Sequence, residues 1–210
     1  MTEYRRIDIP SASWFFTVNL AERKSNRLLT DKIDLLHEAF RYTKKRHSFR
    51  MNAVVILPDH LHCIWTLPPN DTDFSGRWNM LKGYFSRNIE KGERVSASRT
   101  SRRERGIWQR RFWEHLLRDQ MDFNRHVDYI HWNNVKHGGV NKVSDWPQSS
   151  FHRYLKQGIY MENWVNNEAY LIENSTARLM RLLASAHPTN WSAGFACNKI
   201  VFNHPVLYLL

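Results

Sequence analysis

Two histidines, His60 and His62, stand one residue apart inside the apolar stretch LPDHLHCIW, at 57–65. Side chains two positions apart on a strand point to the same face, so both imidazoles project together. The flanking residues are apolar at odd and even positions alike, which is typical of a strand buried on both faces. Burying two imidazoles without partners would cost on the order of 1–3 kcal/mol each. The pattern indicates either structural or solvent-exposed histidines, or a metal site in which one cation satisfies both rings.

A second group of polar side chains lies in the helix-like stretch DYIHWNNVKHG, at 128–138. At about 3.6 residues per turn, Tyr129 and Asn133 lie one above the other on the same face. A phenol in this position can approach a metal ion that the amide helps to hold. The alternative is a surface tyrosine followed by an asparagine that caps the helix. A separate stripe is expected to pack on the sheet: Phe123, Val127, Ile130 and Asn134.

Three further polar residues lie in or near these stretches. Asp59 can orient an imidazole from behind, but strand alternation predicts that it points to the opposite face. His126 lies one turn before Tyr129 and can line the same cleft or contact a phosphate, whereas His131 faces elsewhere. Packing or solvent exposure is the alternative for both histidines.

The composition favours a polyanionic partner. The chain has 210 residues, with 31 Lys and Arg against 20 Asp and Glu, and a formal net charge of +11. Such an excess is typical of proteins that bind nucleic acid, although a basic protein without such a partner is the alternative. Two cysteines are too few for a disulfide scaffold or a cysteine-based zinc site. The polar N-terminus and the lack of a long apolar run predict a cytosolic protein.

The apolar periodicity predicts strands that alternate with helices. Strands are expected at 13–22, at 49–68 with a bend or break at Pro58, and at 106–119. Helices are expected at 30–48, 73–92 and 121–139. The stretch 93–106 carries five arginines among small polar residues and is predicted to be a mobile cationic loop. The order predicts an α+β domain whose helices pack on one face of a mainly antiparallel sheet.

The end of the chain, beyond about residue 163, carries no chemical motif. Residues 145–160 are expected to wrap back onto the core as a tail. Beyond about residue 163 the character changes, with a short amphipathic helix expected at 177–186 and an apolar end.

Six stretches, in this order, resemble the single-tyrosine HUH transposases of the IS200-like class, and within that class the REP-associated tyrosine transposases. They are WFFTVNL, NAVVILPDHLHCIWTLP, DFSGRWNMLK, IWQRRFWEHLLRD, HVDYIHWNNVKHG and SDWPQSSFHR. The resemblance covers residues 3–160 approximately. It implies a ferredoxin- or RRM-like HUH nuclease fold, an antiparallel sheet with helices packed on it, for a catalytic domain at 1–163. The remainder, 164–210, is a C-terminal appendage to which nothing is transferred.

The resemblance also implies roles for site residues. His60 and His62 correspond to the metal ligands, Asn133 takes the place of the third, polar ligand, and Tyr129 matches the nucleophile. The implied cofactor is a divalent ion: imidazole donors favour Mn²⁺, whereas cellular abundance favours Mg²⁺. Many relatives have Asn-Pro where this chain has Asn133 and Asn134, a difference that can shift the helix end but retains the ligand.

The implied activity is cleavage of single-stranded DNA next to hairpins of REP-type repeats. A 5′-phosphotyrosine link and a free 3′-hydroxyl result, and reversal of the step rejoins strands. A site completed within one chain suits a monomer, with a dimer as the alternative. The expected location is the bacterial cytoplasm, at the nucleoid.

Arginines are the candidate DNA contacts, although arginine-rich loops are also common as merely solvated segments. The candidates are Arg5, Arg6, Arg99, Arg102, Arg103, Arg105, Arg110 and Arg111. Two rival functions fit the same residues. One is a metal-dependent phosphohydrolase that activates water and forms no adduct, and the other is a non-catalytic module that binds DNA or RNA hairpins.

Overall fold

A four-stranded antiparallel sheet positions the polar residues identified above. The computed structural model describes residues 9–165. Its strands are β1 (Ser13–Asn19), β2 (Arg50–Ile56), β3 (His60–Thr66) and β4 (Trp113–Leu116), in the order β2-β3-β1-β4. All three pairings are antiparallel. With helices between β1 and β2 and between β3 and β4, this is the ferredoxin-like arrangement, and the α+β prediction is confirmed.

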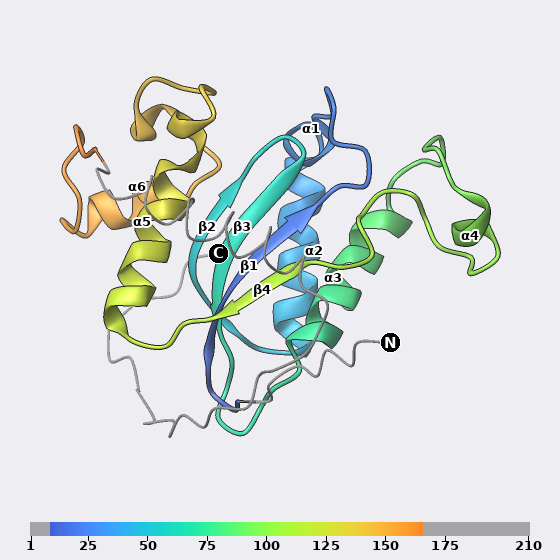
Figure 1. Ribbon diagram of the computed structural model, residues 1–210, viewed down its shortest axis with the longest axis horizontal. Helices are drawn as coiled ribbons and strands as arrows, with labels where there is room; N and C mark the ends of the chain where they lie inside the picture. The colour runs from blue at the N-terminus through green and yellow to red at the C-terminus, as the bar shows by residue number, and fades with distance from the viewer. Residues whose placement is uncertain (1–8, 166–210) are drawn as a thin grey trace, which may run out of the picture.

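Helices cover both faces of this sheet (Figure 1). On one face lie α1 (Leu28–Asp31), α2 (Ile33–Arg46) and α3 (Phe74–Arg87), which pack on the larger apolar core. On the other face lies α5 (Gln120–Lys136), which packs on a smaller core. The expectation that the helices share one face was therefore wrong. Apolar residues of both parities on β1 and β3 leave two faces to cover, and α2 and α3 together cover only one.

Several element boundaries differ from the sequence prediction. The strand expected at 49–68 is a hairpin, β2 and β3, that turns at Pro58 as anticipated. The strand expected at 106–119 forms only over β4, and the preceding residues make a single isolated bridge, from Trp108 to Leu20. The loop expected at 93–106 contains a short helix, α4 (Ala97–Thr100), and the helix expected at 30–48 is interrupted at Lys32.

The tail predicted at 145–160 does wrap back, onto the outer edge of β2. The 3₁₀ turn η1 (Val143–Asp145) leads into this tail, which contains α6 (Phe151–Lys156). The backbone N–H of Ile56 donates to the carbonyl of Gln148, and the Ser150 N–H donates to the carbonyl of Val54. An unpaired strand edge is open to pairing with other chains, so this segment protects the sheet. Residues 166–210, with the helix expected at 177–186, lie outside the described residues.

Candidate active site

The two histidines project from β3 toward α5. Antiparallel pairing with β1 sets His60 opposite Asn19 and His62 opposite Thr17. Both side chains lie in the sheet interior, 7% and 4% exposed, and their ring centroids are 5.0 Å apart. The intervening Leu61 is fully buried on the other face. Strand alternation therefore separates two imidazoles from the apolar core that anchors their strand.

Hydrogen bonds at Nδ1 orient both rings. The Nδ1 atom of His62 lies 2.9 Å from the Thr17 hydroxyl. The Nδ1–H of His60 donates to the Asp59 carboxylate over 2.6 Å, because an ionised carboxylate only accepts. Arg23 holds the same carboxylate through its Nε, at 2.6 Å. A proton on Nδ1 leaves the lone pair on Nε2, the atom through which each ring can bind a metal ion.

Asp59 corrects one sequence expectation. It does contact His60, although strand alternation predicted that it points away. The strand begins only at His60, so Asp59 belongs to the turn and does not follow the alternation. Burial raises the pKa of Asp59, but hydrogen bonds from His60 and Arg23 outweigh it and hold the pKa below its usual value. The turn therefore places a fixed negative charge behind the imidazole pair.

Burial keeps both imidazoles neutral. It lowers the pKa of His60, an effect that Asp59 partly opposes. It lowers the pKa of His62 well below the usual value, and neighbouring His60 adds to the shift. A neutral imidazole is the form that binds a metal ion.

Helix α5 brings the tyrosine and the asparagine to the same place. The Tyr129 ring centroid lies 5.3 Å from that of His62, and the rings meet edge to face. Asn133 is fully buried one turn later, and neither atom of its side-chain amide has a hydrogen-bond partner within residues 9–165. Burial raises the pKa of the Tyr129 phenol, although the nearby Asn133 amide opposes part of this shift.

These residues fit a divalent metal ion. Leaving a buried amide unsatisfied costs about 1–3 kcal/mol, so Asn133 is expected to serve a ligand. Two imidazole Nε2 atoms and one amide oxygen leave coordination positions open for phosphate and water, whereas structural zinc sites are closed by four protein ligands.

Sequence reasoning missed other residues beside the site. Thr17 lies directly across from His62, and it could have been found once the strand pairing was known. The end of α5 adds two basic side chains: the Lys136 ammonium lies 5.7 Å from the centre of the Tyr129 ring, and the His137 ring lies 6.0 Å from that of His60. The letters VKHG at 135–138, where the tyrosine helix ends, were the available signal for both.

The remaining histidines of α5 take different roles. His131 is buried, and its Nε2 lies 2.8 Å from the Ser150 hydroxyl. Its role is therefore packing, the alternative that the sequence allowed. His126 lies on the tyrosine side of the helix, with its ring 4.9 Å from that of Phe15. Phe15 also contacts the rings of His62 and Tyr129, and thus separates His126 from the histidine pair.

Three of the candidate arginines are bound to groups in or next to the loop at 93–106. The Arg99 guanidinium donates to the carbonyls of Arg105 and Trp108, at 2.7 and 2.9 Å. Arg105 pairs with Glu93, and Arg110 pairs with Glu104. These contacts tie the loop to itself and to the segment that follows it.

The other candidate arginines are placed differently. Arg102, Arg103 and Arg111 have exposed side chains. Arg5 and Arg6 lie outside the described residues.

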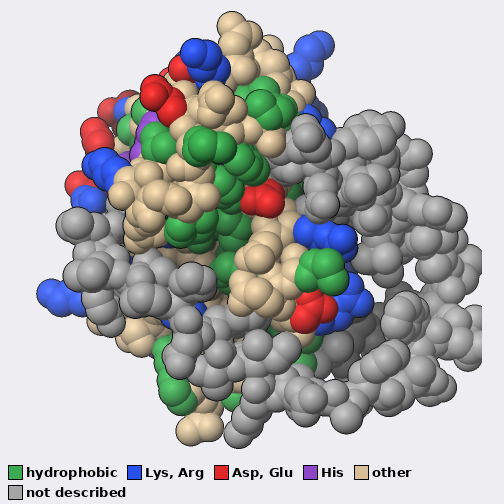
Figure 2. Space-filling view, turned by 90° about the vertical axis from the view of Figure 1, so that its left-hand side faces the viewer, with side chains coloured by type: hydrophobic (Ala, Val, Ile, Leu, Met, Phe, Trp, Pro, Cys, Tyr) green, Lys and Arg blue, Asp and Glu red, His purple; other side chains and the backbone are tan. Residues whose placement is uncertain are grey.

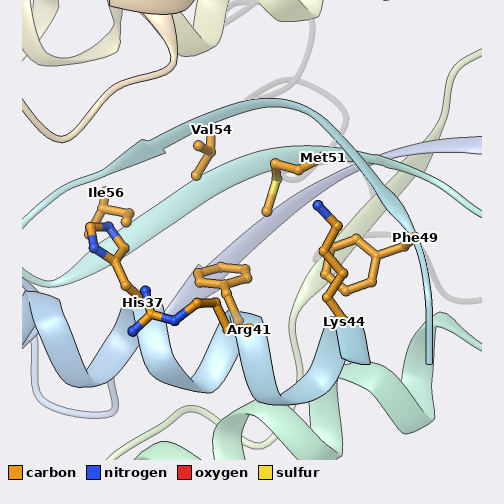
Figure 3. Close-up of a pocket in the computed structure, with 8 residues that line it drawn as sticks. His37, Arg41, Lys44, Phe49, Met51, Val54 and Ile56 are labelled. Carbon is orange, nitrogen blue, oxygen red and sulfur yellow. The ribbon is translucent and has the colours of Figure 1, made fainter. Parts of the chain in front are cut away.

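A hollow on the opposite side of the sheet is separate from this site. It lies between α2 and β2, as Figure 3 shows. Its lining is His37, Phe40, Arg41, Lys44, Phe49, Met51, Val54 and Ile56. None of the candidate site residues contributes to it.

The fold and site agree with comparisons to known proteins. The family model described as "Transposase IS200 like" matches residues 15–133, a span that contains both histidines, the tyrosine and the asparagine. The chain belongs to the IS200-like transposase family and is a transposase. No helix within residues 9–165 is long and apolar enough to cross a membrane.

Individual relatives narrow the comparison. A REP-associated tyrosine transposase of Escherichia coli is 46% identical over 167 residues, which are 80% of this chain and 93% of that protein. A Haemophilus influenzae protein given the corresponding name is 45% identical over 168 residues, 80% of this chain and 95% of the relative. A solved structure of the REP-associated tyrosine transposase bound to a REP hairpin matches with a TM-score of 0.68 and 45% identity. That match covers 80% of this chain and 93% of the other.

Proposed function

We propose that this transposase cleaves and rejoins single-stranded DNA beside REP-type hairpins, with Tyr129 as the nucleophile. One observation carries the proposal: the phenol, the two imidazoles and the unsatisfied Asn133 amide meet between β3 and α5. A relative at 45% identity that was solved with a REP hairpin supports the choice of partner.

In the cleavage step the Tyr129 oxygen attacks the scissile phosphorus. A bond forms between that oxygen and phosphorus, and the bond from phosphorus to the 3′-oxygen breaks. The phenol loses its proton, and the departing 3′-oxygen takes one up to become a hydroxyl. The product is a 5′-phosphotyrosine link, which a 3′-hydroxyl can attack in the reverse sense to rejoin DNA.

Several groups of the chain assist this step. An ordinary phenol has a pKa of ~10, and burial of Tyr129 raises it further, so proton loss needs help. The Lys136 ammonium beside the Tyr129 ring favours the phenolate and attracts a phosphate. Packing of Phe15 against both Tyr129 and His62 fixes the distance between nucleophile and ligands, and positioning supplies much of the rate.

His60, His62 and Asn133 would hold a divalent ion, Mg²⁺ or Mn²⁺. When bound, such an ion polarises the scissile phosphate and stabilises charge that develops on its oxygens. Thr17 and Asp59 would keep the two imidazoles in the ligand tautomer and orientation.

The DNA hairpin would be held by arginines. Arg102, Arg103 and Arg111 have exposed guanidinium groups that can reach phosphates, and Arg5 and Arg6 are proposed to grip the strand or read guanine edges. For Arg99, Arg105 and Arg110, DNA contact requires sharing a guanidinium that already binds the loop. All site groups come from one chain, which supports a monomer. The site of action would be the nucleoid in the cytoplasm.

Trapping the covalent adduct tests this proposal. Single-stranded DNA that contains a REP-type hairpin, labelled on the 3′ side of the scissile phosphate, is incubated with the protein and Mn²⁺ and then run on a denaturing protein gel. We expect the label to migrate with the protein. The Tyr129→Phe variant is expected to lose the adduct and to retain DNA binding.

Two other results would contradict the proposal. Cut DNA without any adduct in the wild-type protein would point to a phosphohydrolase. Binding that excess chelator leaves unchanged, with no cut DNA, would point to a non-catalytic hairpin-binding module. Tyr154→Phe is a matched control, because Tyr154 packs near β2 and not between the imidazoles and α5.

A further inference from the structure

Beside the nucleophile lies a second set of metal-binding side chains. His115 is on β4, where it pairs with Phe15 of β1 and therefore faces α5. Asp122 and His126 lie on the first two turns of α5, four residues apart and thus on one side of the helix. Ligand atoms of the three residues all lie within 4.8 Å of one another.

The geometry of this cluster converges on the Asp122 carboxylate. Its Oδ2 is 3.1 Å from the Nε2 of His115, and its Oδ1 is 3.1 Å from the Nδ1 of His126. The two imidazoles are stacked, with centroids 4.8 Å apart and planes at 19°. Bonds of about 2.0–2.2 Å from a tetrahedral ion to nitrogen and carboxylate oxygen place neighbouring donors a little over 3 Å apart. Each imidazole is at this distance from one carboxylate oxygen, and all three ligand atoms lie within 4.8 Å, so a bound cation would need to draw the donors only slightly closer together.

Charge and burial also suit a cation. Burial raises the pKa of Asp122, but hydrogen bonds from His115, His126 and the Arg118 backbone outweigh it, so the pKa stays far below its usual value. The carboxylate is thus ionised. His126 is 6% exposed, whereas the His115 and Asp122 side chains are 24% and 12% exposed, which leaves an entry from solvent.

We propose that His115, Asp122 and His126 bind one divalent transition-metal ion, separately from His60, His62 and Asn133. The Nδ1 of His126 lies 2.8 Å from the Asp122 backbone carbonyl and 3.1 Å from the carboxylate. The ion would take the place of the proton on Nδ1, and Nε2 would carry the ring proton instead. Two imidazoles and one carboxylate suit Zn²⁺, Co²⁺ or Mn²⁺ and leave positions for water or a phosphate oxygen.

Such an ion would join β4 to the start of the helix that carries the nucleophile. His126 lies three residues before Tyr129, and Phe15 contacts both rings. The ion would therefore fix the position of α5 and add positive charge on the side where a polyanion approaches. The assignment does not depend on the proposed cleavage chemistry.

The test uses the 210-residue chain without a tag, with the His60 and His62 imidazoles replaced so that the other proposed metal site cannot bind. A His60→Ala, His62→Ala double variant is stripped with chelator, dialysed against Zn²⁺ and analysed for bound metal. We expect about one equivalent of Zn²⁺. Adding His115→Gln is expected to remove it or to weaken binding at least tenfold, whereas adding His47→Gln, on an exposed histidine of the α2 end, should change nothing.

Co²⁺ provides a second readout. In the same double variant we expect visible absorption bands of a Co²⁺ ion with nitrogen ligands, and their loss with His115→Gln or with His126→Asn. Circular dichroism checks the fold of each variant. If the folded double variant retains no metal, or if His115→Gln binds as well as its parent, the cluster is only a hydrogen-bonded brace and the proposal is wrong. Neither result affects the adduct assay, which tests the proposed function independently.

Discussion

The two faces of the sheet use the same strands for different purposes. On the face under α2 and α3, Trp65 stacks on Trp78 with ring centroids 4.2 Å apart, and Phe49 covers the other side of Trp65 at 4.2 Å. On the face under α5, the same strand, β3, presents His60 and His62. One face is an apolar core, and the other combines a small core with titratable side chains.

This difference shows how a small domain can carry buried polar groups. Each imidazole loses hydration, and hydrogen bonds to Thr17 and Asp59 offset only part of that cost. The apolar core on the opposite face stabilises the shared strands, at ~25 cal/mol per Å² of buried apolar surface. Arg77, a deeply buried charge on that face, is compensated by Asp71 and by backbone carbonyls.

Substituting one residue on each face should affect cleavage activity and the free energy of unfolding separately. We expect His62→Ala to lower cleavage at least ~10²-fold, the loss typical of a missing preorganised contact to the transition state, and to change stability little. Leu81→Ala, in the core of α3, should lower the free energy of unfolding by ~2–5 kcal/mol and leave the activity of folded molecules intact. Urea denaturation and adduct yield measure the two effects. A stable Leu81→Ala variant without activity would contradict the separation.

A milder change on the polar face tests the support of His62. Thr17→Val keeps the shape of the side chain but removes the oxygen near Nδ1. We expect metal affinity and cleavage to fall by ~10- to 100-fold, the usual effect of losing a group that orients a metal ligand. Titration with Mn²⁺ measures the affinity. Ser13→Ala on the same strand is the control, because its hydroxyl bonds Thr66 and is far along β1 from His62.

Acid should lower the stability of the protein through a buried histidine of the polar face, His131. Burial, together with Arg153 and His152, lowers the pKa of His131 to about 3 from 6.5. As pH falls below 6.5 the unfolded chain binds the proton and the folded chain does not, so stability drops by ~1.4 kcal/mol per pH unit until about pH 3. Urea denaturation at several pH values should show a smaller slope for His131→Asn. An unchanged slope would mean that His131 is not buried as a neutral ring, and His47→Asn serves as the exposed control.

The smallest effect is expected at the surface, where the charge serves binding and not the fold. Arg102→Ala with Arg103→Ala should leave stability unchanged and reduce the salt dependence of hairpin binding. Each lost phosphate contact lowers the slope of log K against log salt by ~0.7–0.9. Binding isotherms at several salt concentrations measure it. Lys45→Ala with Arg46→Ala, at the end of α2, is the matched control, and an equal effect there would show that only net charge matters.

Local sequence patterns were sufficient for much of this structure. Alternation in β3 predicted that His60 and His62 share a face, and helical spacing predicted the same for Tyr129 and Asn133. The ends of the strands were harder to predict. Only four residues of the stretch 106–119 form a strand, because the length of β4 is set by its pairing with β1, and local propensity does not reveal that pairing. Asp59 was misjudged since a turn ignores strand alternation.

By itself, the sequence determined which residues have the chemistry, on which element they lie and which side of that element they share. These properties follow from backbone geometry over a few residues. Only the tertiary structure decided that α5 crosses the face of β3, so that Tyr129 and Asn133 meet the imidazole pair, and that His115 meets Asp122 and His126. Contacts between distant segments depend on how whole faces pack, and no local spacing encodes that.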